Sequence, residues 1–290
     1  MFTPFAFVKT ATIPVTPFTG VLDTYPSAAG AWSVRRLSST YTGSILTVRR
    51  ASDNTTQNIG YTANGDLDTS TLSSFCAGTA GYVTTLYDQS GNGVNLSQVT
   101  NIRQPLIYSS GSIITKGPNA EPSMYFDGIQ THLSGAYATS SNSYMSVFGV
   151  TAPFDTGSNY VSYAQSNNSN IPPAFGLIDQ DIFKDFMWGA GQEATYTPNT
   201  TNLATRAGIR KAAATQNTVY LNGTAGSVTG TITDVTIGPV ITLGCIFSAT
   251  NGGDGTFPYK GWISELIVWR SDQTSNVSGI DTNMGNYYGI

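Results

Sequence analysis

Four polar residues in one short segment, Asp88, Gln89, Ser90 and Asn92, are the first candidates for chemistry in this sequence. They directly follow residues 82–87, whose β-branched and aromatic types are typical of a half-buried strand. Oxygen atoms and amide groups therefore gather at the end of a strand, where they could bind a cation such as Ca²⁺ or the hydroxyl groups of a sugar. The alternative is an Asx-type turn, in which these side chains bond their own backbone.

Length and composition predict one large β domain. The chain has 290 residues, enough for a sizeable core, and only 10% of them are charged. Abundant Gly, Thr, Ser and Asn favour strands and turns over long helices. No linker or internal repeat divides the chain, so we expect a single domain over residues 21–290 and an extended arm over residues 1–20. A net charge of −4 argues against binding of nucleic acid through overall charge, which requires clustered Lys and Arg.

Short apolar segments separated by turns predict an all-β sandwich. An Asn222-Gly223 pair, typical of a tight hairpin, indicates that two of the strands are antiparallel neighbours. The expected strands cover residues 44–50, 57–61, 82–87, 123–127, 144–150, 160–164, 174–178, 207–210, 218–222, 235–237, 241–247 and 261–270.

A few short helices are expected beside these strands. One is predicted over residues 28–39, where the spacing of the larger side chains suits a helix and no proline intervenes. A second should begin after Asp68, whose carboxylate can accept hydrogen bonds from the free amides of the first turn. A third should close the chain, because Val277, Ile280 and Met284 recur at helical spacing.

The N-terminal arm combines large apolar residues with Pro4, Pro14 and Pro17, which favour an extended backbone. Such an arm needs a surface to cover it, either the chain's own sheet or a neighbouring subunit. We expect a neighbouring subunit, and therefore an oligomer or a larger assembly. The arm has no basic leader and no unbroken apolar region, so it does not resemble a signal peptide. No run of about 18 apolar residues occurs, so no membrane contact is expected.

Cys76 and Cys245 are the only cysteines, and their wide separation predicts two free, buried thiols. Free thiols indicate assembly in a reducing cytoplasm. His132 is the only histidine, which argues against a Ser-His-Asp catalytic triad and against a histidine-based metal site. His132 is expected to cap a loop. No cofactor is expected, with Ca²⁺ the one ion considered.

Several motifs between residues 41 and 98 match a known pattern. They are Tyr41-Thr-Gly43, Val48-Arg49-Arg50-Ala-Ser-Asp53, Ile59-Gly60, Ser74-Phe-Cys-Ala-Gly-Thr79 and Thr84-Thr-Leu-Tyr-Asp-Gln-Ser-Gly91. This block resembles the first part of the catalytic domain of the fungal-type (B-type) α-L-arabinofuranosidases. It is also similar to a block in phage and bacterial proteins with laminin-G or concanavalin-like sandwiches, and residues 124–128 and 261–269 resemble two strands of that fold. The resemblance implies a concanavalin A-like (jelly-roll) β-sandwich.

The resemblance also implies a pair of catalytic carboxylates. The acid/base aspartate of the enzymes would correspond to Asp254, which follows Gly252-Gly253 and precedes a Gly-Thr-Phe sequence. Their nucleophile is a glutamate, and the nearest match, within residues 177–182, offers Asp181 instead. An aspartate is one methylene shorter, and a displacement of about 1 Å can lower a rate by about a hundredfold. The local disulfide of the enzymes is missing too, because Gly81 stands five residues after Cys76.

These departures favour a protein without catalytic activity. We expect a structural or adhesive protein on the surface of a bacteriophage virion, as a capsid decoration or tail-associated protein, assembled in the host cytoplasm. Its expected partners are other virion proteins, reached through the arm, and cell-surface glycans. The alternative is an α-L-arabinofuranosidase-like glycoside hydrolase that uses Asp254 and Asp181. A third hypothesis is a glycan-binding module whose aromatic side chains stack on sugars, with Tyr160, Tyr163, Trp188 and Tyr259 as candidates.

Overall fold

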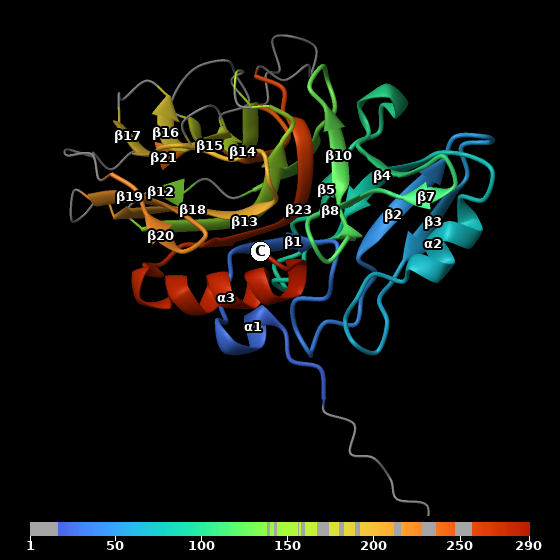
Figure 1. Cartoon of the computed structure of the whole chain (residues 1–290), viewed down its shortest axis with the longest axis horizontal. Coiled ribbons are helices and arrows are strands. Elements are labelled where there is room, and N and C mark those ends of the chain that lie inside the picture. Colours follow the sequence, from blue (N-terminus) through green and yellow to red (C-terminus); the bar gives the residue numbers. More distant parts are fainter. Residues whose placement is uncertain are drawn as a thin grey trace, which may run out of the picture.

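The computed structural model describes residues 17–290, except for 138–139, 142–143, 156, 158–159, 167–173, 180–182, 189–191, 212–215, 228–235 and 247–256. Within these residues, nineteen strands form one continuous antiparallel sheet that folds over into two layers, and two of the helices, α1 (Val21–Thr24) and α3 (Val277–Tyr288), cover one face (Figure 1). The prediction of a β-sandwich with a few short helices is confirmed at this level. Most of the predicted N-terminal arm lies outside the described residues.

One layer, here called the helix-side layer, is centred on the long strand β23. This strand pairs with β13 along one edge and with β1 and β10 along the other. From β13 the layer continues through β18 and β19 to β20. The bounds are β1 (Gly30–Ser33), β10 (Met124–Asp127), β13 (Met145–Pro153), β18 (Ala204–Lys211), β19 (Gln216–Leu221), β20 (Thr224–Ala225) and β23 (Lys260–Trp269).

The second layer, here called the outer layer, runs in the order β5, β11, β22, β14, β15, β16, β17. Strands β4 and β6 connect the two layers at one end of the molecule, and β2 and β3 extend this end through the pairing of β2 with β4. The outer-layer bounds are β5 (Leu96–Ser97), β11 (Leu133–Ala136), β22 (Val240–Leu243), β14 (Tyr160–Ser166), β15 (Ala174–Asp179), β16 (Phe183–Trp188) and β17 (Gln192–Tyr196). The connecting strands are β2 (Leu46–Arg50), β3 (Thr56–Ile59), β4 (Gly81–Leu86) and β6 (Leu106–Ser109), and the short remaining pieces are β7 (Ser112–Ile113), β8 (Thr115–Lys116), β9 (Glu121–Pro122), β12 (Ser140–Ser141) and β21 (Thr236–Ile237).

The core has two parts, one on each face of the helix-side layer. Between the layers pack side chains such as Trp32, Phe126 and Phe183. On the opposite face, α1 and α3 cover β13, β18 and β23. Each large apolar side chain that is fully buried stabilises the fold by about 1.5–3 kcal/mol. The predicted closing helix is confirmed.

The helix α2 (Thr69–Phe75) begins where the sequence predicts. The Asp68 carboxylate accepts a hydrogen bond from the backbone amide of Thr71 at 3.0 Å, and the Thr71 and Ser70 hydroxyls also donate to it. These hydrogen bonds lower the pKa of Asp68 to about 2, with the Thr71 hydroxyl contributing most. The cap therefore stays ionised, and effective, down to strongly acidic pH.

The helix predicted over residues 28–39 is wrong, because this segment contains β1 instead. All four residues of β1 are buried, with Trp32 facing the core between the layers and Ala31 facing the helices. A strand covered on both faces shows no alternation of apolar and polar residues, so its sequence pattern does not distinguish it from a buried helix. The Asn222-Gly223 hairpin is confirmed, with φ angles of 45° and 70° at the turn between β19 and β20.

The two cysteines are free and buried, as the sequence predicts. Burial raises the pKa of both thiols, so little reactive thiolate exists at neutral pH. We expect a thiol reagent to label neither cysteine in the native protein and both after denaturation. A Cys76→Ala variant should then show one reactive thiol after denaturation. Failure to detect any thiol in the denatured wild-type protein would mean that the two are paired.

Among the described residues, no helix is long and apolar enough to cross a membrane.

Candidate active site

Asp181 and Asp254 both lie outside the described residues, but the strands around them show where their segments start and end. Asp179 is the last residue of β15 and pairs directly with Phe183, the first residue of β16. Residues 180–182 therefore link two neighbouring antiparallel strands. The Asp181 segment therefore starts and ends where these two strands of the outer layer end, at one end of the strands rather than at an edge strand.

The segment that contains Asp254 also starts and ends at one place. It follows β22, whose last residue, Leu243, pairs with Tyr163 of β14. Just beyond, the Gly244 amide donates to the Ser162 carbonyl at 3.0 Å, and the Tyr259 amide donates to the Gly244 carbonyl at 2.7 Å. These two hydrogen bonds close the base of the segment against the start of β14.

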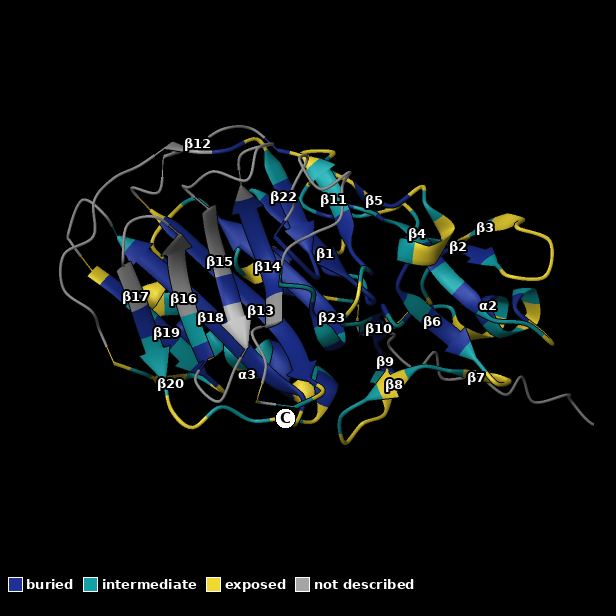
Figure 2. Ribbon diagram, turned by 90° about the horizontal axis from the view of Figure 1, so that it is seen from above, coloured by how far each residue is buried: buried dark blue, intermediate teal, exposed yellow. Residues whose placement is uncertain are grey.

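The strand order brings the bases of these two segments to the same end of the outer-layer strands. Strand β14 pairs antiparallel with β15 on one side and with β22 on the other, so β15 and β22 run parallel (Figure 2). Their C-terminal ends point the same way, and two strand spacings of about 4.8 Å separate their axes by about 10 Å. Segments that leave strands this close can place two carboxylates on either side of one sugar.

A glycine fixes the direction in which the chain leaves β22. Gly244 has a φ of +93°, and a Cβ at this position would lie 2.5 Å from the Phe126 ring and 2.9 Å from the Thr131 carbonyl oxygen. Only glycine fits such a turn without displacing the core. The Thr242 hydroxyl also donates to the Cys245 carbonyl at 2.6 Å. The packed core therefore sets the direction of the chain at Gly244 and Cys245.

The central loop places its polar side chains against the backbone. Asp88 Oδ1 lies 2.9 Å from the amides of both Ala31 and Ser90, while Oδ2 accepts from the Ser90 hydroxyl at 2.8 Å and from the Val94 amide at 3.1 Å. This is the Asx-type turn that the sequence left open as the alternative to a binding site, extended by the bond to Ala31 in β1. Asp88 is 6% exposed, and its two oxygens hold β1 against the end of β4.

Gln89 and Asn92 also act as connectors. The Gln89 side chain accepts from the Leu37 amide and donates to the Arg35 carbonyl, both at 2.8 Å, as a neighbouring strand would. Asn92 donates to the Ala28 carbonyl at 3.0 Å. The loop nevertheless borders a pocket of about 280 Å³ that Gln89, Ser90 and Tyr41 help to line. Ligand binding by this loop therefore stays a prediction.

Tyr163 and Tyr259 are 0% exposed, so the prediction that they stack on sugars is wrong. Their rings fill the core between the layers. The other two candidates, Tyr160 and Trp188, have side chains outside the described set. His132 is buried and hydrogen-bonded through its two ring nitrogens to Gln98 and to the Gln130 carbonyl, both at 2.9 Å.

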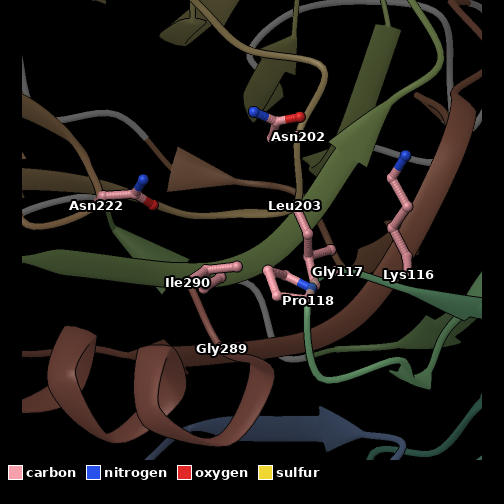
Figure 3. Close-up of a pocket in the computed structure, with 8 residues that line it drawn as sticks. All are labelled: Lys116, Gly117, Pro118, Asn202, Leu203, Asn222, Gly289 and Ile290. Carbon is pink, nitrogen blue, oxygen red and sulfur yellow. The ribbon is translucent and has the colours of Figure 1, made fainter.

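A further pocket of about 510 Å³ lies beside the C-terminal end of α3, where Pro118, Leu203 and Ile290 meet and Lys116 extends along one side (Figure 3). Its lining comprises Lys116, Gly117, Pro118, Asn202, Leu203, Asn222, Gly289 and Ile290. No local sequence pattern reveals this pocket, because its residues come from four distant segments. Within the described part of the chain, no group of three His, Cys, Asp or Glu residues could hold a metal ion.

Of the two groups of proteins that the motif block resembles, known proteins match this chain on the side of the α-L-arabinofuranosidases. The model of the family described as "Alpha-L-arabinofuranosidase B, catalytic" matches residues 22–122. A probable α-L-arabinofuranosidase B of Aspergillus flavus is 43% identical over 74 residues, which are 25% of this chain and 15% of that protein. An α-L-arabinofuranosidase of Hypocrea jecorina is 40% identical over 73 residues, with the same shares of each chain.

Solved structures share the fold over most of the chain. One is a glutamate-to-glutamine mutant of a GH54 α-L-arabinofuranosidase soaked with 4-nitrophenyl α-L-arabinofuranoside, with a TM-score of 0.68, 18% identity, and coverage of 90% of this chain and 63% of that chain. Another is an arabinofuranosidase complexed with arabinofuranosyl-α-1,2-xylobiose, with a TM-score of 0.67, 20% identity and the same coverage. This chain therefore spans less than two thirds of these solved chains, and its matched segment spans 15% of the curated relatives.

These matches correct five predictions. The chain resembles the arabinofuranosidase B catalytic domain, so its assignment to a phage-type concanavalin-like family is wrong. Four further predictions depend on that assignment and are also wrong, because the matched relatives are fungal proteins named as enzymes. They are the absence of catalytic activity, the structural role in a bacteriophage, the associated descriptors such as capsid decoration, and the location in the virion. The motif block is a stronger indicator of the family than the missing glutamate and the missing cysteine, because the enzyme model matches residues 22–122 despite both departures.

Proposed function

We propose that this chain is a glycoside hydrolase that removes α-L-arabinofuranosyl groups from a glycan. The observation that carries the proposal is the match of the arabinofuranosidase B catalytic model to residues 22–122. The shared fold over 90% of the chain supports it, because the strands that follow this block also have counterparts in the solved enzymes. We also propose that the sandwich has the concanavalin A-like jelly-roll connectivity that the sequence resemblance implies.

The proposed catalytic pair is Asp254 as acid/base and Asp181 as nucleophile. Retaining glycosidases place two carboxyl groups about 5–5.5 Å apart, one to attack the sugar and one to protonate the leaving group. Support comes from the strand order, in which β15 and β22 run parallel on either side of β14 and bring the bases of both segments to the same end of these strands. An aspartate nucleophile extends less far than a glutamate, so the proposed enzyme is a slow one.

The test is release of 4-nitrophenol from 4-nitrophenyl α-L-arabinofuranoside. We expect slow but measurable release that rises in proportion to protein concentration. A 4-nitrophenyl glucoside serves as the control for contaminating glycosidases and should not be cleaved. Absence of release at high protein concentration and long incubation would contradict the proposed function.

A further inference from the structure

A row of aromatic side chains crosses the helix-side face of the sheet. Tyr82 of β4 pairs with Leu106 of β6, Leu106 pairs with Tyr125 of β10, and Tyr125 pairs with Trp262 of β23. Residues directly opposite each other in antiparallel strands project from the same face. Tyr82, Tyr125 and Trp262 therefore lie side by side across four strands, over about 14 Å at a strand spacing of about 4.8 Å.

Phe154, which follows β13, extends this line, and the four aromatic residues are here called the aromatic row. The rings of Tyr125 and Trp262 are 5.2 Å apart, and those of Phe154 and Trp262 are 6.4 Å apart and nearly parallel, at 21°. Phe154 is 49% exposed, and the other three rings are partly exposed. Contiguous aromatic surface open to water usually marks an interaction site.

Three cations lie over these rings. Lys116 Nζ is 4.2 Å from the centre of the Trp262 ring, Lys260 Nζ is 3.8 Å from that of Phe154, and the Arg49 guanidinium is 5.0 Å from that of Tyr82. Arg49 is only 7% exposed and is held by the side-chain oxygens of Gln104 and Asn54, so Lys116 and Lys260 are the cations that a ligand can reach.

The nearby carboxylate of Asp127 does not offset this positive charge fully. Its Oδ1 accepts hydrogen bonds from the backbone amides of residues 129, 130 and 131, at 2.8, 3.1 and 3.2 Å. These hydrogen bonds stabilise the ionised carboxylate and hold it in its own loop, so its negative charge remains. Lys116 and Lys260 therefore place two positive charges on the aromatic row, beside the one negative charge of Asp127.

Two hollows lie near the aromatic row. One, of about 470 Å³, is lined by Arg49, Tyr82 and Tyr125 among others. The other is the pocket beside α3, of about 510 Å³, which Lys116 helps to line while it covers Trp262 (Figure 3). The surface thus forms an elongated strip of partly exposed rings, with Lys116 and Lys260 at the Trp262 and Phe154 end.

We propose that the aromatic row binds a chain of acidic pyranose sugars, with uronic acid units as the recognised group. The carboxylates pair with the Lys116 and Lys260 ammonium groups, which leave the ring faces to meet them, and the C–H faces of the sugars then pack on the aromatic rings. An elongated strip suits a linear polymer better than a single small molecule. The site goes beyond the proposed hydrolysis, because its ligand needs no arabinofuranosyl group and none of its residues belongs to the proposed catalytic pair.

The test is titration of the protein with oligogalacturonate, followed by isothermal calorimetry. We expect saturable binding that weakens as salt rises, because the carboxylate contacts are screened. A carboxyl-reduced oligomer of the same length should bind much more weakly. Tyr125→Ala and Lys116→Glu should each raise the dissociation constant by about tenfold or more, the loss expected for one stacking or charge contact.

Tyr144→Ala is the matched control, because Tyr144 is 43% exposed but lies at the opposite end of β13, about 30 Å from Phe154. Its dissociation constant should equal that of the wild type, and unchanged melting temperatures should show that all variants are folded. No binding of oligogalacturonate, equal binding of the reduced oligomer, or unchanged affinity in both row variants would each overturn the proposal. Because the oligomer is not a substrate, the result is separate from that of the hydrolysis test.

Discussion

Asp254→Asn is expected to abolish release of 4-nitrophenol from the aryl arabinofuranoside, and Asp181→Glu is expected to increase it. Loss of a general acid/base typically lowers the rate by about a hundredfold to ten-thousandfold. With an already slow enzyme, that loss would bring turnover to background. The opposite sign of the second change follows from the length of the side chain.

Asp181 stands where the resembling enzymes have a glutamate, so its carboxylate lies one methylene nearer its own backbone. A displacement of about 1 Å from the attacking position can cost about a hundredfold in rate. Asp181→Glu restores the missing reach without changing the charge. We therefore expect kcat to rise by about tenfold to a hundredfold, with a smaller effect on KM, because the gain arises in the transition state.

Asp53→Asn is the matched control for removal of a carboxylate. Asp53 is exposed in the turn between β2 and β3, where it forms an ion pair with Arg50 at 2.6 Å. Its substitution should leave turnover unchanged. Full activity of Asp254→Asn would exclude Asp254 as the acid/base, and a fall in the activity of folded Asp181→Glu would exclude Asp181 as a nucleophile limited by its reach.

The strands were predictable from sequence where one face is polar or a turn is distinctive. Residues 218–222 alternate between buried and partly exposed positions before the Asn222-Gly223 turn, and the local pattern was enough to place β19. Strands β16 and β17 were missed because residues 183–196 contain charged residues and no regular alternation. Residues 30–33 form the strand β1 because of long-range contacts, since Asp88 and Gln89 form hydrogen bonds to it from more than 50 residues away.

The candidate site was predictable only in part, because its geometry also depends on contacts between residues that are far apart in the sequence. The sequence names Asp181 and Asp254 but says nothing of their distance, which depends on β14 lying between β15 and β22. Nor does any local pattern reveal the aromatic row, because Tyr82, Tyr125 and Trp262 become neighbours only through strand register. The polar cluster at Asp88 suggests a binding site in the sequence, but its side chains form hydrogen bonds to a distant backbone. The sequence does not distinguish such side chains from free ligands.

Glu265→Gln is expected to cause a large loss of stability. Glu265 is 1% exposed beneath α3, and its carboxylate accepts from Arg35 Nε at 2.7 Å, from Arg35 Nη2 at 3.0 Å, from the Ser33 hydroxyl at 2.9 Å and from the Tyr288 hydroxyl at 3.2 Å. Glutamine keeps the shape but removes the charge, which leaves the buried Arg35 guanidinium without its counter-ion. Removing one partner of a buried ion pair typically lowers the free energy of unfolding by about 3–5 kcal/mol.

The measurement is urea unfolding of the wild type, of Glu265→Gln and of the double variant Arg35→Met with Glu265→Gln. Much of the cost in the single variant comes from the unpaired buried cation, so replacing Arg35 with an apolar residue of similar length should recover part of the lost stability. Asp53→Asn breaks the exposed ion pair with Arg50 and should shift the urea midpoint only slightly, because solvent screens that pair.

A double variant less stable than Glu265→Gln would show that Arg35 stabilises the fold mainly through its other contacts. Those contacts are a hydrogen bond to Asn283 at 2.9 Å and the face of the Tyr287 ring, 4.6 Å from the guanidinium carbon. Both partners belong to α3, whereas Glu265 belongs to β23. Arg35 therefore joins the helix to the sheet, and recovery in the double variant would show that packing alone can hold α3 in place once the buried charge is removed.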